Sequence, residues 1–156
     1  LAGIPSKRYA DVLISAYRHF GFDAASLIRA LTRLETPVFV YGTLRRGESN
    51  HYLLEGREPL GLSRTRASYD LLDLGRFPGM VAGGSTSVVG EVYMVDPGTL
   101  KRLDALEGHP NFYLRQVIRL EHGIQTSVYL LNSFQGTFPQ IDTGDWTLHN
   151  RTKAQE

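Results

Sequence analysis

The chain has 156 residues, of which 42% are hydrophobic and 21% charged, a balance typical of a globular protein with one substantial core. Its net charge of +1 is too small to indicate nucleic-acid binding, and the absence of cysteine excludes disulfides, thiolate metal sites and a cysteine nucleophile. No apolar run reaches the roughly 18 residues that span a bilayer, and Leu1–Pro5 is too short for a signal peptide. We therefore expect a cytoplasmic protein that binds neither a membrane nor a nucleic acid.

Residues 1–36 are predicted to form a helical N-terminal extension. Up to Phe20, apolar residues recur at the three- and four-residue spacing of an amphipathic helix, and Gly21 then interrupts the pattern. Asp23 is a suitable N-cap for a second helix, which ends before Thr36-Pro37. This helical hairpin is expected to pack against the rest of the chain, to cover a pocket, or to form a homodimer or another protein contact.

Residues 37–150 are predicted to form one α+β domain, followed by a C-terminal tail at residues 151–156. The expected strands are Val38–Tyr41, Ser68–Asp73, Ser87–Val95, Tyr113–Leu120 and Gln125–Leu131. A helix is expected from its cap Asp96 to Glu107, with Gly108 ending it, and Phe77-Pro78-Gly79 is interpreted as a turn. The fold class is therefore α+β, with a mixed, curled sheet or small partial β-barrel crossed by one main helix.

A sharp turn is expected directly after the first of these strands, at Tyr41–Gly47. Consecutive backbone N–H groups in such a turn can hold a carboxylate or an oxyanion. The glycine spacing resembles that of a phosphate-binding loop, but Glu48-Ser49 follows where that loop needs a lysine. Arg45 and Arg46 either hold an acidic substrate or lie on a solvated face.

Glu107 is the candidate general acid/base. The leucines at positions 100, 103 and 106 define an apolar stripe, and Glu107 lies only about 40° from its centre, whereas Asp104 lies about 100° away, toward water. A carboxylate at the C-terminal end of a helix faces the negative end of the helix dipole, and partial burial disfavours its charge further. Both effects raise its pKa toward neutrality, as a general acid/base needs. The alternative is a solvated acid at a frayed helix end.

Several motifs occur together in a recognisable order. They are Tyr41-Gly42-Thr43-Leu44 after a strand, Phe77-Pro78-Gly79, Gly90-Glu91-Val92-Tyr93, Leu103-Asp104-x-Leu106-Glu107-Gly108 and Tyr113-x-Arg115. Over about residues 37–147 this set resembles the γ-glutamylcyclotransferase-like family, which includes γ-glutamylamine cyclotransferases and AIG2-like proteins. The closing Gly144-Asp145-Trp146 is similar to the short bacterial branch of that family. The resemblance does not extend to residues 1–36.

The resemblance implies a cofactor-independent and metal-free enzyme that acts on a small-molecule γ-glutamyl amide. The α-amine of the substrate would attack its own γ-carbonyl, releasing 5-oxoproline and a free amine or amino acid, with Glu107 as general acid/base. It also implies that the backbone of Tyr41, Gly42, Thr43 and Leu44 binds the substrate and that Tyr113 orients it. Arg115 is either a site residue or a structural ion-pair partner, and Tyr93 and Phe77 are either site residues or core aromatics.

Two other functions are compatible with the sequence. The turn and Glu107 could hold a small zwitterion in a non-enzymatic binding or regulatory module, with the N-terminal hairpin relaying occupancy to a partner. The Arg45-Arg46 face could bind an anionic polymer, against which the small net charge argues. The leaving group of the substrate is expected to be set by the loops Gly75–Gly84 and Asn132–Gly144.

Overall fold

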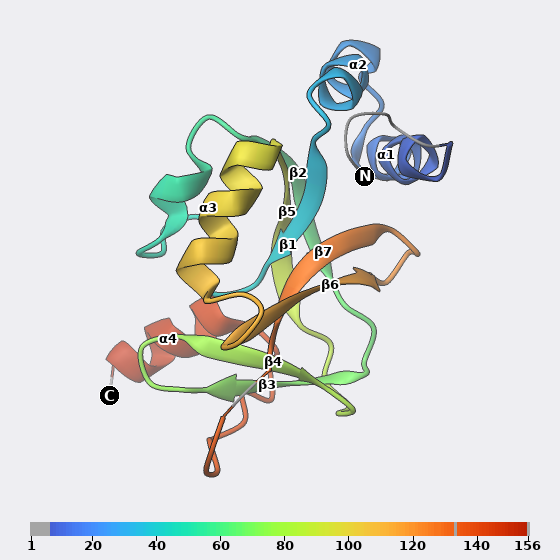
Figure 1. Ribbon diagram of the computed structural model, residues 1–156. Coiled ribbons are helices and arrows are strands. Elements are labelled where there is room, and N and C mark those ends of the chain that lie inside the picture. Colours follow the sequence, from blue (N-terminus) through green and yellow to red (C-terminus); the bar gives the residue numbers. More distant parts are fainter. Residues whose placement is uncertain (1–6, 133, 156) are drawn as a thin grey trace.

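The computed structural model describes residues 7–132 and 134–155 (Figure 1). The helices are α1 (Lys7–Phe20), α2 (Ala24–Thr32), the 3-10 helix η1 (His51–Leu54), α3 (Pro97–Glu107) and α4 (Trp146–Ala154). The strands are β1 (Thr36–Val40), β2 (Glu58–Arg64), β3 (Tyr69–Asp73), β4 (Pro78–Ala82), β5 (Val89–Val95), β6 (Tyr113–Arg119) and β7 (Gln125–Leu131). Within these residues, no helix combines the length and the apolar character that crossing a membrane requires.

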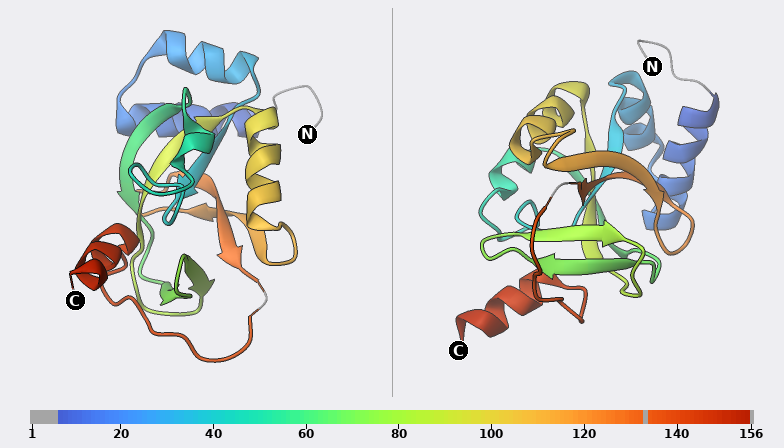
Figure 2. Two further views of the ribbon diagram at one scale, coloured as in Figure 1. Left: turned by 90° about the vertical axis from the view of Figure 1, so that its left-hand side faces the viewer. Right: turned by 60° about the horizontal axis from the view of Figure 1, so that its bottom comes forward.

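The main sheet is mixed and strongly curled. It has five strands in the order β2-β5-β1-β7-β6, in which β1 and β7 run parallel and the other neighbours run antiparallel. Its two edges touch at one corner, where Thr65 forms a bridge with Leu120 and the N–H of Glu121 donates to the carbonyl of Arg64. No longer ladder joins β2 to β6 in the described residues. The predicted α+β class with a curled, incompletely closed sheet is confirmed (Figure 2).

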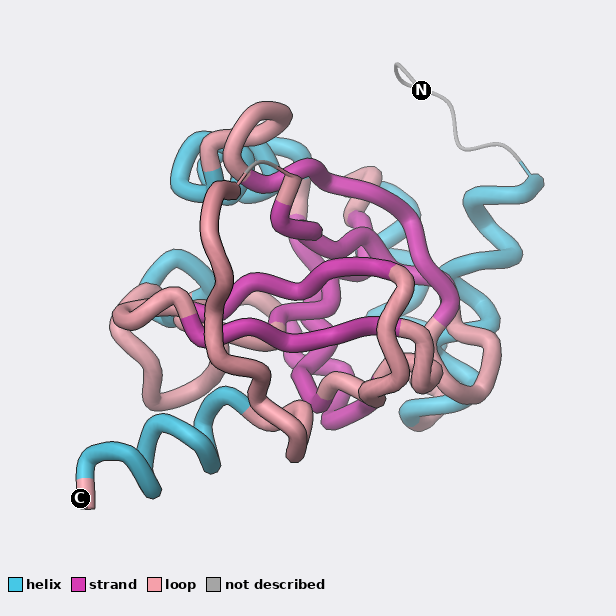
Figure 3. The backbone as a smooth tube through the Cα atoms, turned by 90° about the horizontal axis from the view of Figure 1, so that it is seen from below, coloured by secondary structure: helices cyan, strands magenta, loops and turns pink. Residues whose placement is uncertain are grey.

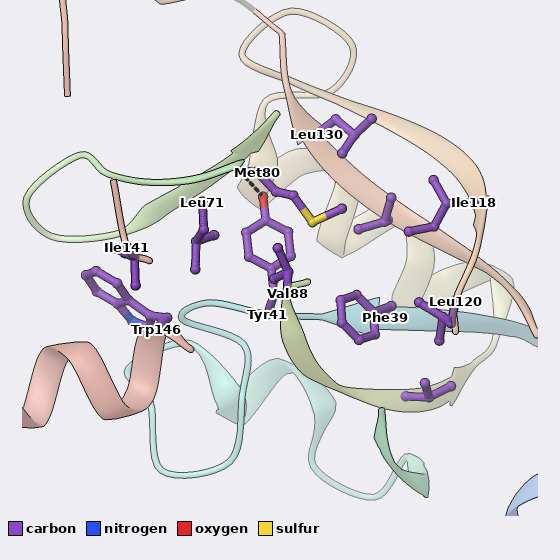
Figure 4. Close-up of a cluster of buried hydrophobic side chains, with 12 residues drawn as sticks. Phe39, Tyr41, Leu71, Met80, Val88, Ile118, Leu120, Leu130, Ile141 and Trp146 are labelled. Atoms are coloured by element: carbon purple, nitrogen blue, oxygen red, sulfur yellow. Dashed lines mark hydrogen bonds between the residues drawn. The ribbon is translucent and has the colours of Figure 1, made fainter. Parts of the chain in front are cut away.

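A separate two-stranded hairpin, β3–β4, packs over the curled sheet (Figure 3). Between them lies a buried core to which β1, β3, β4, β5, β6, β7 and the C-terminal segment contribute (Figure 4). Its residues are Phe39, Tyr41, Leu71, Met80, Val88, Val92, Ile118, Leu120, Val128, Leu130, Ile141 and Trp146. The hairpin packs so closely on β7 that a Cβ atom at Gly79 would lie only 2.7 Å from Leu131 Cδ2. Glycine at this position therefore permits the close packing.

The two predicted N-terminal helices are present as α1 and α2. Asp23 caps α2, as expected, by accepting hydrogen bonds from the backbone N–H groups of Ala25 and Ser26. The pair packs on the sheet through a buried cluster around Met94, and the Tyr17 hydroxyl donates to Glu58 on β2. Both helices lie at the opposite end of the molecule from α4 (Figures 1 and 2). The N-terminal helices therefore pack on the main sheet through Met94 of β5 and Glu58 of β2.

The strands expected from the sequence are present with ends shifted by at most two residues, but four elements were missed, namely β2, β4, η1 and α4. Interpreting Phe77-Pro78-Gly79 as a turn was wrong, since Pro78 begins strand β4, a position where a missing N–H is tolerated. Strand β2 escaped notice because a register shift between Pro59 and Gly61 breaks its alternation. Helix α4 was also missed, and it runs across the boundary expected between residues 150 and 151.

Candidate active site

A cavity of about 330 Å³ opens between the turn after β1, the C-terminal end of α3, and the starts of β4 and β6. The structure brings all the candidate site residues to this cavity, namely Tyr41, Gly42, Thr43, Leu44, Glu107 and Tyr113. None of the described residues of α1 or α2 lines it, so these two helices do not form a wall of this pocket.

The turn after β1 presents unused backbone donors. Arg45 N donates to Gly42 O at 3.0 Å, and Asn50 N donates to Thr43 O at 2.8 Å, which closes the segment on itself. The N–H groups of Gly42, Thr43 and Leu44 donate to no acceptor in the described part of the chain. Glycine is needed at position 42 because a Cβ there would lie 2.8 Å from Pro78 Cγ.

Ion pairs behind the turn hold it in place. Arg45 is buried, and its guanidinium contacts Glu91 Oε2 at 3.0 Å and Asp145 Oδ1 at 2.8 Å. Trp146 Nε1 donates to Glu48 Oε1 at 3.2 Å, which adds a second contact between the C-terminal segment and the turn. Arg45 is therefore a structural residue and neither a substrate ligand nor part of a solvated face. The Gly144-Asp145-Trp146 motif therefore has a structural role, because Asp145 and Trp146 hold the turn through Arg45 and Glu48.

Glu107 is the last residue of α3, a helix whose ends follow the sequence signals. The Asp96 side chain caps the start by accepting from Thr99 N at 2.7 Å, and Gly108 ends it in a left-handed conformation with φ 65°. The Glu107 carboxyl lines the cavity, and burial raises its pKa from 4.5 to about 7. No charged neighbour or hydrogen bond contributes to this shift. A carboxyl in this state is divided between its two protonation forms near neutral pH.

The two tyrosines of the site anchor strand β4. The Tyr41 hydroxyl donates to Tyr129 O at 2.7 Å and accepts from Met80 N at 3.1 Å, the contact marked in Figure 4. The Tyr113 hydroxyl donates to Pro78 O at 2.6 Å. Burial, and to a smaller extent the nearby Glu107 carboxyl, raise the pKa of both phenols, so they remain neutral. Both residues line the cavity, while their hydroxyls are hydrogen-bonded to backbone atoms.

The second acid of α3 behaves differently from the expectation. Asp104 does not point to water: it accepts from Arg115 Nε at 2.8 Å and from the Tyr129 hydroxyl at 2.7 Å. Burial opposes its charge, but the hydrogen bonds from Arg115 and Tyr129 hold the pKa of Asp104 below its ordinary value. Of the two roles open for Arg115, the structure shows the structural ion pair. The helical angle alone did not reveal that β6 and β7 supply partners on that side.

The loop Gly75–Gly84 contributes Arg76, Phe77 and Pro78 to the lining, as expected of a pocket wall. Several other lining residues were not named as site residues from the sequence. These are Phe39, Val40, Ser49, Asn50, Leu106, Phe112 and Tyr129. Phe77 lines the cavity, whereas Tyr93 is a core residue whose hydroxyl donates to Glu91. Expecting Asn132–Gly144 to form a pocket wall was wrong, because no described residue of that segment lines the cavity. The signal for Arg76 and Phe112 was their position directly beside the Phe77-Pro78-Gly79 and Tyr113-x-Arg115 motifs.

The fold and the partly buried Glu107 beside a turn with unused backbone donors define a small α+β protein with a candidate acid/base site. In a comparison with known protein families, residues 38–148 match the family described as gamma-glutamyl cyclotransferase, AIG2-like. The chain belongs to this family. A relative from Vibrio cholerae is 47% identical over 109 residues, which cover 70% of this chain and 93% of that protein. The gamma-glutamylcyclotransferase family protein YtfP of Escherichia coli is 37% identical, covering 70% of this chain and 94% of its own.

Solved structures show the same fold. The chain is similar to the crystal structure of an AIG2-like protein from mouse, with a TM-score of 0.59 and 28% identity, covering 69% of this chain and 86% of that one. The solution structure of E. coli YtfP gives a TM-score of 0.59 with 34% identity, covering 73% of this chain and 98% of the other. The matched family region ends at residue 148 and begins at residue 38, after α1 and α2.

Proposed function

We propose that the protein is a γ-glutamyl cyclotransferase that converts a γ-glutamyl amide into 5-oxoproline and a free amine or amino acid. Membership of the family supports the class of enzyme. The observation that supports catalysis is the Glu107 carboxyl, whose pKa is raised to about 7 by burial in a cavity beside unused backbone donors. A carboxyl that can both accept and donate a proton at neutral pH suits a reaction in which one amine is deprotonated and another is protonated.

In the proposed reaction, the substrate's α-amine nitrogen attacks its own γ-carbonyl carbon and closes a five-membered lactam. Glu107 accepts the proton lost by the attacking nitrogen and delivers it to the departing nitrogen as the bond between that nitrogen and the γ-carbon breaks. Because the attack is intramolecular, the protein gains most by folding the substrate so that amine and carbonyl meet. Tyr41 and Tyr113 are among the residues that line the cavity in which this folding would occur.

The turn after β1 is proposed to bind negative charge on the substrate. The N–H groups of Gly42, Thr43 and Leu44 have no acceptor among the described residues, and these three residues line the same cavity as Glu107. They would hold the glutamyl carboxylate or the oxyanion that forms at the γ-carbonyl. One such donor is typically worth about 3 kcal/mol in the transition state. Arg45, Glu91 and Asp145 keep the turn rigid, so the donors need no rearrangement during the reaction.

The test is the release of 5-oxoproline from a panel of γ-glutamyl amines, γ-glutamyl amino acids and glutathione. Wild type is compared with Glu107→Gln, which keeps the shape of the side chain but cannot transfer the proton. We expect turnover to fall by about two to four orders of magnitude. Glu55→Gln is the matched control, because Glu55 is exposed and lies outside the cavity lining. The control should keep wild-type turnover.

Two results would contradict the proposal. Turnover that survives in Glu107→Gln would remove Glu107 as the proton carrier, while the reaction itself would stand. Binding of 5-oxoproline or glutamate by wild type without turnover of any compound in the panel would favour the non-enzymatic binding module instead.

A further inference from the structure

We infer that Arg76, together with an apolar rim formed by Leu106, Phe77 and Phe112, is a subsite for the leaving group of the substrate. It selects an amino acid that has a free carboxylate and an apolar or aromatic side chain over an amine that lacks the carboxylate. This inference rests on the proposed function, because it assigns a role to the part of the cavity that the glutamyl group does not need.

The cavity lining contains a single cation and a single anion among its described residues, Arg76 and Glu107. The Arg76 side chain is exposed and forms no ion pair with any described residue. Arg45 and Arg115, in contrast, are each held by a carboxylate of the protein. The one positive charge of the cavity is therefore available to a ligand, and a guanidinium binds a carboxylate through two parallel hydrogen bonds.

The rim beside Arg76 is apolar and open. Leu106 and Phe112 line the cavity, yet 41% and 40% of their surfaces remain exposed. The Phe77 and Phe112 rings meet edge to face with centroids 6.0 Å apart, and Phe112 packs in the same way on Tyr113 at 5.0 Å. Large apolar side chains exposed around a cavity gain from being covered by a ligand. The rim thus suits an apolar side chain on the leaving group, next to the cation.

Two residues of the rim are sequence neighbours of residues proposed to act at the reacting bond. Leu106 directly precedes Glu107, which would protonate the departing nitrogen, and Phe112 directly precedes Tyr113. An amino acid leaving group carries its carboxylate and its side chain on the carbon attached to that nitrogen. Both groups would therefore emerge from the reacting bond into the cavity that Glu107, the rim and Arg76 line together. A diamine leaving group would instead bring a second positive charge toward Arg76, with only Glu107 to offset it.

Arg76 has one competing use, which is to hold the α-carboxylate of the glutamyl group. The turn already offers three unused N–H groups for that carboxylate or for the oxyanion. A γ-glutamyl amino acid has two carboxylates, and the cavity has two separate places that suit an anion, the turn and Arg76. A γ-glutamyl amine would leave one of them empty.

The experiment compares γ-glutamyl-phenylalanine with γ-glutamyl-phenethylamine, two compounds that differ only in the carboxylate of the leaving group. Their dissociation constants are measured by calorimetry on the Glu107→Gln protein, in which turnover is suppressed, with and without Arg76→Gln. We expect the carboxylate-bearing compound to bind at least tenfold more tightly, and Arg76→Gln to abolish that preference by weakening this compound alone. Arg66→Gln, at an exposed arginine outside the cavity lining, should leave the preference unchanged.

Other outcomes separate the possibilities. Equal affinities for the two compounds would overturn the inference, and so would an equal loss for both in Arg76→Gln, which would assign Arg76 to the glutamyl carboxylate. For the rim, Phe112→Ala should weaken γ-glutamyl-phenylalanine at least fivefold more than γ-glutamyl-glycine, and equal effects would exclude an apolar contact. The proposed function is tested separately, and it fails if the wild-type protein releases no 5-oxoproline from any compound of the panel.

Discussion

Helix α3 carries two acids in opposite environments. Asp104 faces β6 and β7, where Arg115 and Tyr129 satisfy its charge and lower its pKa. Glu107, one turn further on, faces the cavity, where burial alone raises its pKa to about 7. Burial opposes the charge of both acids, but only for Asp104 is it outweighed by hydrogen bonds. An acid with donors becomes part of the framework, whereas a buried acid without them keeps a pKa at which it can exchange a proton near neutral pH.

The largest expected effect is on the pH dependence of stability, and it concerns Glu107. Its folded pKa is raised, so its proton is bound more tightly in the folded state than in the unfolded state. Its contribution is complete below pH 4.5 and is lost as pH rises to about 7. At about 1.4 kcal/mol for each pKa unit, the free energy of unfolding should fall by about 3 kcal/mol relative to Glu107→Gln. Urea unfolding of both proteins between pH 4.5 and pH 8 measures this difference.

The same titration should control the rate. If Glu107 acts as the base, kcat/KM rises with pH and reaches a plateau above about 7, where the carboxyl is ionised in the free enzyme. A stability difference between wild type and Glu107→Gln that does not change with pH would mean that Glu107 is solvated. The contrast between the two acids would then disappear.

Asp104→Asn should have a smaller effect on stability and the opposite pH response. Removing the charge leaves the half-buried Arg115 guanidinium without its anion, at a cost of about 1.5 kcal/mol near pH 7. Because the folded pKa of Asp104 is lowered, its contribution is present above the unfolded pKa and is lost as pH falls through the folded pKa. The difference from wild type should therefore shrink in acid, which the same unfolding series would detect. A loss of turnover comparable to that of Glu107→Gln would contradict the framework role.

How far the sequence predicts the site depends on how local each contact is. The cap at Asp96, the stop at Gly108 and the apolar stripe of α3 lie within a dozen residues, and together they placed Glu107 correctly at a partly buried helix end. The helical angle of Asp104 predicted a side chain that points to water. This was wrong because its partners, Arg115 and Tyr129, come from β6 and β7, which are distant from it along the chain.

Arg45 shows the same limit over a longer distance. Its two partners, Glu91 and Asp145, lie 46 and 100 residues away along the chain. No local pattern distinguishes such a buried, paired arginine from a solvated one. Strand β4 was missed for a related reason: Pro78 and Gly79 have turn-like local preferences, and only pairing with β3 and close packing of Gly79 on Leu131 make them a strand. Local signals thus located the catalytic candidate, while the framework around it is set by contacts between distant segments.

A pair of tyrosine variants gives the smallest and most specific comparison. Tyr129→Phe removes the hydroxyl that donates to Asp104, and Tyr113→Phe removes the hydroxyl that donates to Pro78 O. Each loses one hydrogen bond, so each should lower the free energy of unfolding by about 1 kcal/mol. Only Tyr129→Phe removes a bond that lowers the pKa of Asp104. Tyr129→Phe alone should raise the pKa of Asp104, as followed by NMR titration of its carboxyl carbon.

Tyr113→Phe should leave the inflection in kcat/KM near pH 7, because burial and not a hydrogen bond raises the pKa of Glu107. An inflection that moves toward the ordinary glutamate value in Tyr113→Phe would show that the phenol, and not burial of the carboxyl, raises the pKa of Glu107.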